Sequence, residues 1–452
     1  MADFLGSVWW MIVSLGVLVT FHNSGHSGGP RRGGVKVLRF SVGFGKPLWS
    51  RRNRNGTEFA IAAIPLGGYV KMLDEREVEV PAGERAVAFN NKTVWQRIAI
   101  VAAGPAANLI LCIALLWAMF VIGRQDYSAT IGRTTGMAAQ AGFVAGDRIL
   151  AVEDRSVDTW AEASMAFTTA AMDRQDAHVR VRDSLDNERT RVLPLSQLPA
   201  GFDERQVPVQ AGFIWQFWLQ PAQIDSVSAD SAATGLLQPG DLILAVDGQR
   251  VDSADQVTPL IQQLGQRGGP GMVEVERNGE RLALELTPQA GQGPDGKPRW
   301  LIGVGFATNQ APAYDARQQY GVFAALPAAV RETGKLAADS LGMMRRMLTG
   351  HASVKNISGP ITIARVANAS AERGLDWFLY FLALLSLSLC IINLLPIPIL
   401  DGGHLLYYLI ELVKGSPLSE RAMAAGQFIG LALLAGLMGL AFYNDILSLV
   451  PR

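Results

Sequence analysis

Two histidines, His22 and His26, stand four residues apart in the stretch FHNSGHSGGP, residues 21–30, at the end of the first apolar run of the chain. On a helix, this spacing places both imidazoles on one face. Zinc accepts imidazole nitrogen and carboxylate oxygen, usually in a tetrahedral arrangement. Because two histidines at the end of a membrane span are also consistent with simple interfacial polar residues, a metal site requires a third ligand from elsewhere in the sequence.

A carboxylate that could complete such a site, Asp401, lies in the stretch NLLPIPILDGGH, residues 393–404. An Asp at membrane depth is costly and marks a functional site by default. Pro396 and Pro398 interrupt the helix before it, and irregular backbone survives at that depth only inside protein or beside a water-filled cavity. Asp401 would then be the third ligand and leave the fourth position to water, as in catalytic zinc sites. His404 is a competing ligand, which we rank as a supporting residue.

The composition is typical of a membrane protein, since 49% of the 452 residues are hydrophobic and only 18% are charged. Four segments have about the 20 apolar residues that a spanning helix needs; they are residues 4–21, 98–123, 377–395 and 428–443. The formal net charge is zero, so nothing in the overall charge indicates a nucleic-acid partner. Cys112 and Cys390 lie inside apolar runs and predict neither a disulfide framework nor a cysteine zinc site.

Basic residues are distributed unevenly around the first span. None lies in residues 1–21, whereas nine lysines and arginines lie in residues 31–71. The positive-inside rule therefore predicts that the loop after the first span is cytoplasmic and that the N-terminus is outside. Alternating spans then place residues 124–374 outside and bring both candidate metal-ligand segments to the cytoplasmic side.

Two segments of the outer region repeat each other. GDRILAVEDRSVD, residues 146–158, and GDLILAVDGQRVD, residues 240–252, match at eight of thirteen positions. Each predicts a tight Gly-Asp turn followed by a buried strand, and both resemble PDZ domains of bacterial periplasmic proteases. A PDZ fold binds an extended peptide by strand addition, although a packing or size-gating domain without peptide is equally consistent. The amphipathic helix expected after the second copy suits either the outer membrane surface or packing against protein.

Together these features resemble the site-2 protease family of intramembrane zinc metalloproteases, and within it the RseP type of Gram-negative bacteria. The resemblance covers essentially the whole chain, from the four spans and the PDZ-like pair to NLLPIPILDGGH. It extends to the motifs RFSVGFGKPLW, GTEFAIAAIPLGGYVKMLDE, AFNNKTVWQRIAIVAAGPAANL and ISGPITIA. It implies an α-helical membrane protein with four transmembrane helices, a membrane-associated β element and two periplasmic PDZ-like α+β domains.

The resemblance also implies roles for individual residues. His22, His26 and Asp401 would bind Zn²⁺. The β element before the second span would present an edge, including Gly67 and Gly68, to an extended substrate. Asn393 would hold substrate backbone, although a helix-end cap beside the prolines is equally consistent.

The implied activity is hydrolysis of a peptide bond in or near the transmembrane helix of a single-span protein, by a multi-pass enzyme of the bacterial inner membrane. The expected substrate is an anti-sigma factor of the sigma-E stress response, already trimmed outside by another protease, and the PDZ pair would exclude untrimmed substrates by size. Partners besides the substrate would be membrane lipid and peptides or proteins bound by the PDZ domains.

The expected organisation begins with a first span at 1–22, a cytoplasmic loop with the β-hairpin at 23–96 and a second span at 97–123. PDZ-like domains at 124–215 and 216–308 and a periplasmic amphipathic helical linker at 309–374 follow. The chain continues with a third span at 375–396, the LDG motif and a cytoplasmic loop at 397–424, and a fourth span at 425–445.

One segment departs from the family pattern, which has glutamate directly after the first histidine. Asn23 has no carboxylate to accept a proton, so it cannot act as the general base, and loss of a positioned acid/base typically costs about 10²–10⁴-fold in rate. Gly28 and Pro30 weaken the helix, which predicts a frayed last turn at His26. A divergence confined to residues 23–30 fits an inactive membrane scaffold that binds proteins through its PDZ pair, or a local error in the coding sequence.

Overall fold

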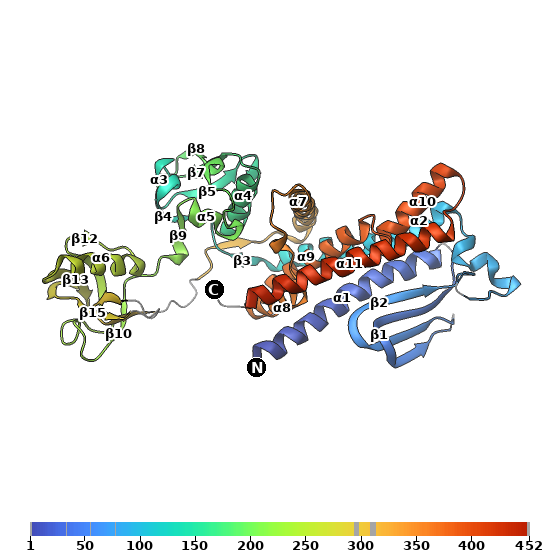
Figure 1. Ribbon diagram of the computed structural model, residues 1–452, viewed down its shortest axis with the longest axis horizontal. Helices are drawn as coiled ribbons and strands as arrows, with labels where there is room; N and C mark the ends of the chain where they lie inside the picture. Colours follow the sequence, from blue (N-terminus) through green and yellow to red (C-terminus); the bar gives the residue numbers. More distant parts are fainter. Residues whose placement is uncertain are drawn as a thin grey trace. The chain divides into compact units, whose positions relative to one another are not determined.

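Among the described residues, four helices are long and apolar enough to span a membrane: α1 (Ala2–Arg32), α2 (Val94–Ile122), α9 (Leu375–Leu394) and α11 (Glu420–Leu449) (Figure 1). The computed structural model describes residues 2–32, 34–54, 56–76, 78–292, 298–307 and 313–449. The chain divides into two units, residues 1–125 with 317–452, and residues 126–316. All four predicted spans are therefore helical, and they belong to the first unit.

The first helix is longer than the sequence predicted. We expected a span that ends at residue 22 and a frayed turn at His26, but α1 continues through both histidines to Arg32. The prediction of a frayed turn is wrong: α1 packs closely against α2 at Gly25, and the helix continues through Pro30 although proline removes one backbone hydrogen bond. His26 therefore lies inside a continuous helix.

The second helix is the centre of the first unit. α2 begins with a capping box between Thr93 and Gln96, and it contacts α1, α7 (Val322–Leu348), α9 and α10 (Asp401–Lys414). Helices α1 and α2 approach closely at Gly25, where an added Cβ would overlap the carbonyl oxygen of Ala103. Small residues allow this approach, as is common between membrane helices.

The β-hairpin expected before the second span is present as β1 (Val37–Arg52) and β2 (Glu58–Met72), which lie beside α1 (Figure 1). Residues 37–42 of β1 pair with 68–72 of β2, and residues 47–52 pair with 58–62. Residues 39–42 are also in register with 58–61, so segments of β2 flank this part of β1 on both sides. The result is a curled sheet whose far half, from Phe44 to Arg52, is exposed.

The helices that follow the outer region pack against the spans. α7 buries Ala325, Ala328 and Ala329 in the cluster that contains α2 and α9, whereas its Phe323 is 93% exposed. The N-terminus of α8 (Pro360–Arg373) is capped by the buried carboxylate of Asp445 in α11, which accepts hydrogen bonds from backbone amides, including those of residues 359 and 361, at 2.8–3.3 Å. The amphipathic helix predicted from sequence is thus present, and it packs against protein on its small-residue face.

The second unit contains the two repeats, each with its own hydrophobic core. The first has a four-stranded antiparallel sheet in the order β6-β5-β7-β8, and the second has the matching order β12-β11-β13-β14. The first comprises β4 (Ile131–Thr134), α3 (Gly136–Gln140), β5 (Arg148–Val152), β6 (Arg155–Ser156), α4 (Trp160–Met172), β7 (Ala177–Arg182), β8 (Glu188–Leu193), α5 (Val207–Gln210) and β9 (Phe213–Trp215). The second comprises β10 (Ile224–Val227), β11 (Leu242–Val246), β12 (Gln249–Arg250), α6 (Ala254–Arg267), β13 (Gly271–Arg277), β14 (Glu280–Leu286), β15 (Gln289–Gln292), β16 (Pro298–Leu301) and β17 (Val304–Phe306). Strands β3 (Arg124–Asp126) and β18 (Ala316–Gln318) lie at the limits of this region.

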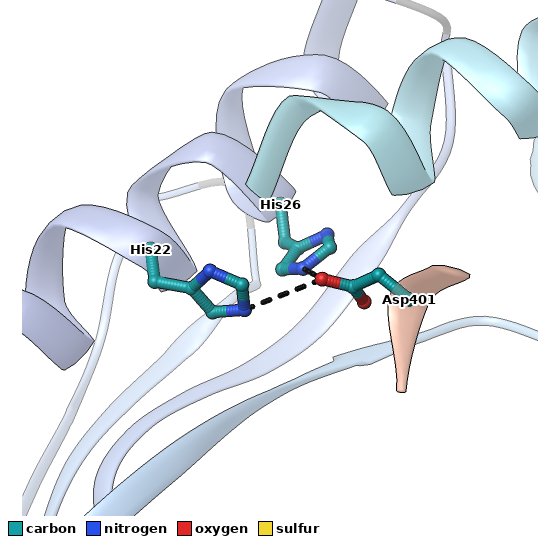
Figure 2. A group of neighbouring side chains, drawn as sticks. All are labelled: His22, His26 and Asp401. Carbon is teal, nitrogen blue, oxygen red and sulfur yellow. Dashed lines mark hydrogen bonds and ion pairs between the residues drawn. The ribbon is translucent and has the colours of Figure 1, made fainter. Parts of the chain in front are cut away.

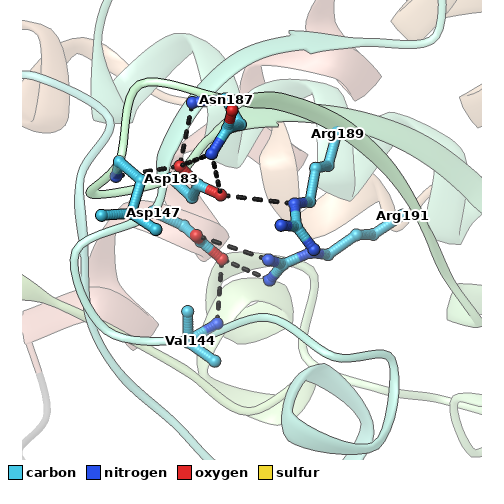
Figure 3. Close-up of polar contacts among 7 residues, drawn as sticks. Val144, Asp147, Asp183, Asn187, Arg189 and Arg191 are labelled. Atoms are coloured by element: carbon cyan, nitrogen blue, oxygen red, sulfur yellow. Dashed lines mark hydrogen bonds and ion pairs between the residues drawn. The ribbon is translucent and has the colours of Figure 1, made fainter.

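The repeated Gly-Asp pair has the same structural role in both copies. Asp147 is fully buried, accepts a hydrogen bond from the Val144 amide at 2.9 Å and pairs with Arg191 (Figure 3). In the second copy, Asp241 accepts from the Gln238 amide at 2.8 Å and pairs with Arg277 at 2.7 Å. Each aspartate therefore fixes the turn before its strand, and an arginine neutralises the buried charge.

Candidate metal centre

The two histidines of α1 and the first residue of α10 lie close together. The Nε2 atoms of His22 and His26 lie 3.6 Å and 3.3 Å from Oδ2 of Asp401 (Figure 2). Two ligands bound at roughly 2.0–2.1 Å to a tetrahedral zinc ion lie about 3.4 Å apart. The three side chains are 20%, 12% and 18% exposed, so the group is largely shielded and still accessible. The donor set and its spacing fit a zinc ion with an open fourth position.

The broken segment after α9 determines where Asp401 lies. Helix α9 ends at Leu394, and α10 begins at Asp401 after extended backbone at Leu400. A Cβ on Gly402 would overlap the Leu395 carbonyl oxygen, and one on Gly403 would overlap that of Ile397. The two glycines after Asp401 are therefore needed for α10 to pack against the loop that precedes it.

Helix α2 forms the wall behind the histidines. Gly104 faces His26, and a Cβ there would overlap the imidazole. One turn later, Nδ2 of Asn108 lies 3.3 Å from Nδ1 of His22. Sequence reasoning missed both residues, although an amide inside an apolar span is itself a signal, since polar groups at membrane depth are costly.

Asn23, which directly follows the first histidine, is directed toward the β-sheet. Its side-chain amide donates a hydrogen bond to the Ser41 carbonyl of β1 at 3.1 Å, and the residue is 2% exposed. Asn23 therefore connects α1 to β1, and it supplies no group that can take up a proton.

The remaining predicted site residues lie around the metal-ligand group. Asn393 is in the last turn of α9, and Gly67 and Gly68 are in β2, where Gly68 faces Ser41 and Asn23. His404 is in the first turn of α10, with its ring 6.2 Å from that of Tyr407. Within the described residues, the group that could hold a metal ion contains His22, His26 and Asp401, and His404 is not part of it.

An ion pair that the sequence did not reveal joins the helix behind the site to the helix that carries Asp401. Arg97 of α2 lies 2.7 Å from Glu411 of α10, and its guanidinium lies 4.9 Å from the ring centre of Tyr408. Both charged side chains are nearly buried, at 11% and 13% exposure. The pair links α2 and α10 at a point remote from the ligands.

Comparisons with known proteins identify the family of the chain. The sequence model of peptidase family M50 matches residues 10–437 of this chain. The chain is 63% identical to a protein of Xylella fastidiosa (strain 9a5c), provisionally named a zinc metalloprotease, over 99% of this chain and 100% of that protein. It is 42% identical to the regulator of sigma-E protease RseP of Salmonella typhimurium over 97% of this chain and 99% of that protein. The regulator of sigma-E protease RseP of Escherichia coli (strain K12) is 39% identical over 98% of this chain and 99% of that protein. Among solved structures, a PDZ domain of an SdrC-like protein from Listeria innocua is similar to 21% of this chain and covers all of that chain, with 21% identity and a TM-score of 0.17. Because the family match and the relatives extend over nearly the whole sequence, the chain belongs to peptidase family M50.

Proposed function

We propose that this protein is an intramembrane zinc metalloendopeptidase that cleaves single-span membrane proteins. The observation that supports this most directly is the convergence of His22, His26 and Asp401 from two ends of the chain. The relatives named as regulators of sigma-E protease suggest an anti-sigma factor, trimmed beforehand on the outer side, as the substrate. The basic loop after α1 supports an inner-membrane orientation with the zinc site toward the cytoplasm and the PDZ-like repeats in the periplasm.

The residues around the site have distinct parts in this proposal. A zinc ion held by His22, His26 and Asp401 would polarise the scissile carbonyl and lower the pKa of a bound water. The β1–β2 sheet would receive the substrate as an added strand beside Gly67 and Gly68, and Asn393 would hold its backbone. The PDZ-like repeats would restrict access by the size of the outer domain or bind peptide segments.

Asn23 limits the expected rate. Because its amide cannot accept the proton of an attacking water, we propose that turnover is about 10²–10⁴-fold lower than with glutamate there. The bond from Asn23 to Ser41 favours a second candidate function, a catalytically inactive pseudoprotease that acts as a membrane scaffold and binds proteins through its PDZ-like repeats.

The test is cleavage of a model single-span substrate by the purified full chain and by Asn23→Glu, with zinc content measured on both. We expect about one zinc ion in each and faster cleavage by Asn23→Glu. His22→Ala should lose both zinc and cleavage. If Asn23→Glu binds zinc and substrate but remains inert, the protease assignment fails and the scaffold function is favoured.

A further inference from the structure

Asn108 is a fully buried amide in the interior of α2. Its backbone carbonyl accepts a hydrogen bond from Ser386 of α9 at 2.7 Å. Its side chain lies 3.3 Å from Nδ1 of His22, on the side of the imidazole opposite the atom that approaches Asp401. Among the described residues, its Oδ1 has no hydrogen-bond partner.

The orientation of this amide decides which nitrogen of His22 is protonated. If Nδ2 donates to Nδ1, then the neutral imidazole carries its proton on Nε2, which is the atom that lies 3.6 Å from Asp401. A nitrogen that carries a proton has no lone pair for a metal ion. If the amide oxygen and nitrogen are exchanged, Oδ1 accepts from Nδ1–H, and the lone pair of Nε2 is free to face the ligand group.

The second orientation requires no additional loss of hydrogen bonding, because the unpartnered buried atom simply changes from Oδ1 to Nδ2.

We propose that Asn108 is a positioning residue that accepts Nδ1–H of His22 through Oδ1 and thereby directs the Nε2 lone pair toward the metal. The inference rests on the zinc site of the proposed function and is independent of whether the protein cleaves a substrate. Partners of this kind orient metal-binding histidines and typically contribute 10–100-fold in affinity or activity.

The test compares Zn²⁺ affinity, measured by chelator competition on the full chain, for wild type, Asn108→Leu and Asn108→Asp. We expect Asn108→Leu to bind about 10–100-fold more weakly, because the acceptor is lost. Asn108→Asp should stay close to wild type, because a carboxylate accepts from Nδ1–H and cannot donate when ionised. The matched control is Ser386→Ala, which removes a hydrogen bond to the same residue without affecting its side chain, and it should leave zinc affinity unchanged.

A second measurement needs no zinc. Nitrogen NMR of histidine-labelled, metal-free protein reports the tautomer of His22, identified by the signal lost in His22→Gln. We expect Nδ1–H in wild type and in Asn108→Asp, with a shift toward Nε2–H in Asn108→Leu. An Nε2–H tautomer in wild type, or wild-type zinc affinity in Asn108→Leu, overturns the proposal. If wild type binds no zinc but shows Nδ1–H, the metal assignment fails while the role of Asn108 in orienting the ring stands.

Discussion

Asn23 of α1 and Ser41 of β1 are joined by a hydrogen bond of 3.1 Å from the Asn23 side-chain amide to the Ser41 carbonyl. The bond connects the helix that carries both candidate histidine ligands to the sheet that is the expected substrate edge. Asn23, which lies between those two histidines, therefore has a structural role although its amide cannot act as a base. An ionised glutamate at this position could not donate a hydrogen bond to the Ser41 carbonyl. The Asn23→Glu substitution would therefore supply a general base and lose the hydrogen bond between α1 and β1.

We therefore expect Asn23→Leu to destabilise the protein by about 1–3 kcal/mol, because it leaves the buried Ser41 carbonyl without its partner. The midpoint of thermal unfolding in detergent should fall accordingly. Ser24→Ala is a suitable control on the same helix, because Ser24 is exposed and its hydroxyl donates back to the Thr20 carbonyl at 2.6 Å. Equal stability of the Asn23→Leu variant and the control would show that the bond contributes nothing.

The ion pair of Arg97 with Glu411 gives a second prediction. Removing one partner of a nearly buried pair leaves an uncompensated charge, which typically costs about 3–5 kcal/mol. Arg97→Met should therefore lower the free energy of unfolding by about that amount. The double variant Arg97→Met/Glu411→Leu should recover most of the loss, and a double-mutant cycle measures the coupling. Additive losses in the double variant would contradict this account.

The sequence predicted the four spans and the ligand trio because their signals are local or chemical. The spans follow from continuous apolar runs, and Asp401 from the cost of a carboxylate at membrane depth. The proximity of Asp401 to the histidines was inferred from the ligands that zinc prefers and from the prediction that both segments lie on the cytoplasmic side, and the family resemblance implied the same trio. No local pattern connects residues so far apart in the chain.

Other features could not be predicted because they depend on packing between helices. Local propensity at Pro30 indicated a frayed end, yet α1 continues past it and is packed against α2 at Gly25. The contact of Asn108 with His22 and the ion pair of Arg97 with Glu411 each join residues that are distant in sequence. The sequence shows only that a polar residue lies in or near an apolar segment. It does not indicate which residue that polar side chain contacts.

The second repeat should lose stability in acid in a defined way. Hydrogen bonds from the Arg277 guanidinium hold the pKa of the Asp241 carboxyl below its usual range. Because the pKa in the folded state is lower than the unfolded value of about 3.9, the stabilisation is fully present above that pH. It is lost as the pH falls through the folded pKa, where the carboxylate becomes protonated.

Hydrogen exchange of the β11 amides in the full chain, corrected for intrinsic exchange, measures this effect between pH 6 and pH 3. Protection should decrease at the acid end in wild type, whereas Asp241→Asn should be less protected at pH 6 and change less with pH. Asp252→Asn removes an exposed carboxylate of the same repeat and should behave as wild type. An unchanged acid response in Asp241→Asn would assign the effect to other groups.

Gly104 gives the most local prediction for the metal centre. A methyl group there would overlap the His26 imidazole, so Gly104→Ala must displace the ring that approaches Asp401 at 3.3 Å. We expect Zn²⁺ affinity to fall by at least tenfold, since displacement of one ligand disrupts a tetrahedral site. Gly16→Ala is the matched control: its added methyl group meets nothing within 4 Å, and alanine favours the helix by roughly 0.5–1 kcal/mol. Chelator competition on both variants measures the difference. Wild-type zinc affinity in Gly104→Ala would mean that His26 does not bind the metal in the orientation described, because no ligand in that orientation could tolerate the methyl group.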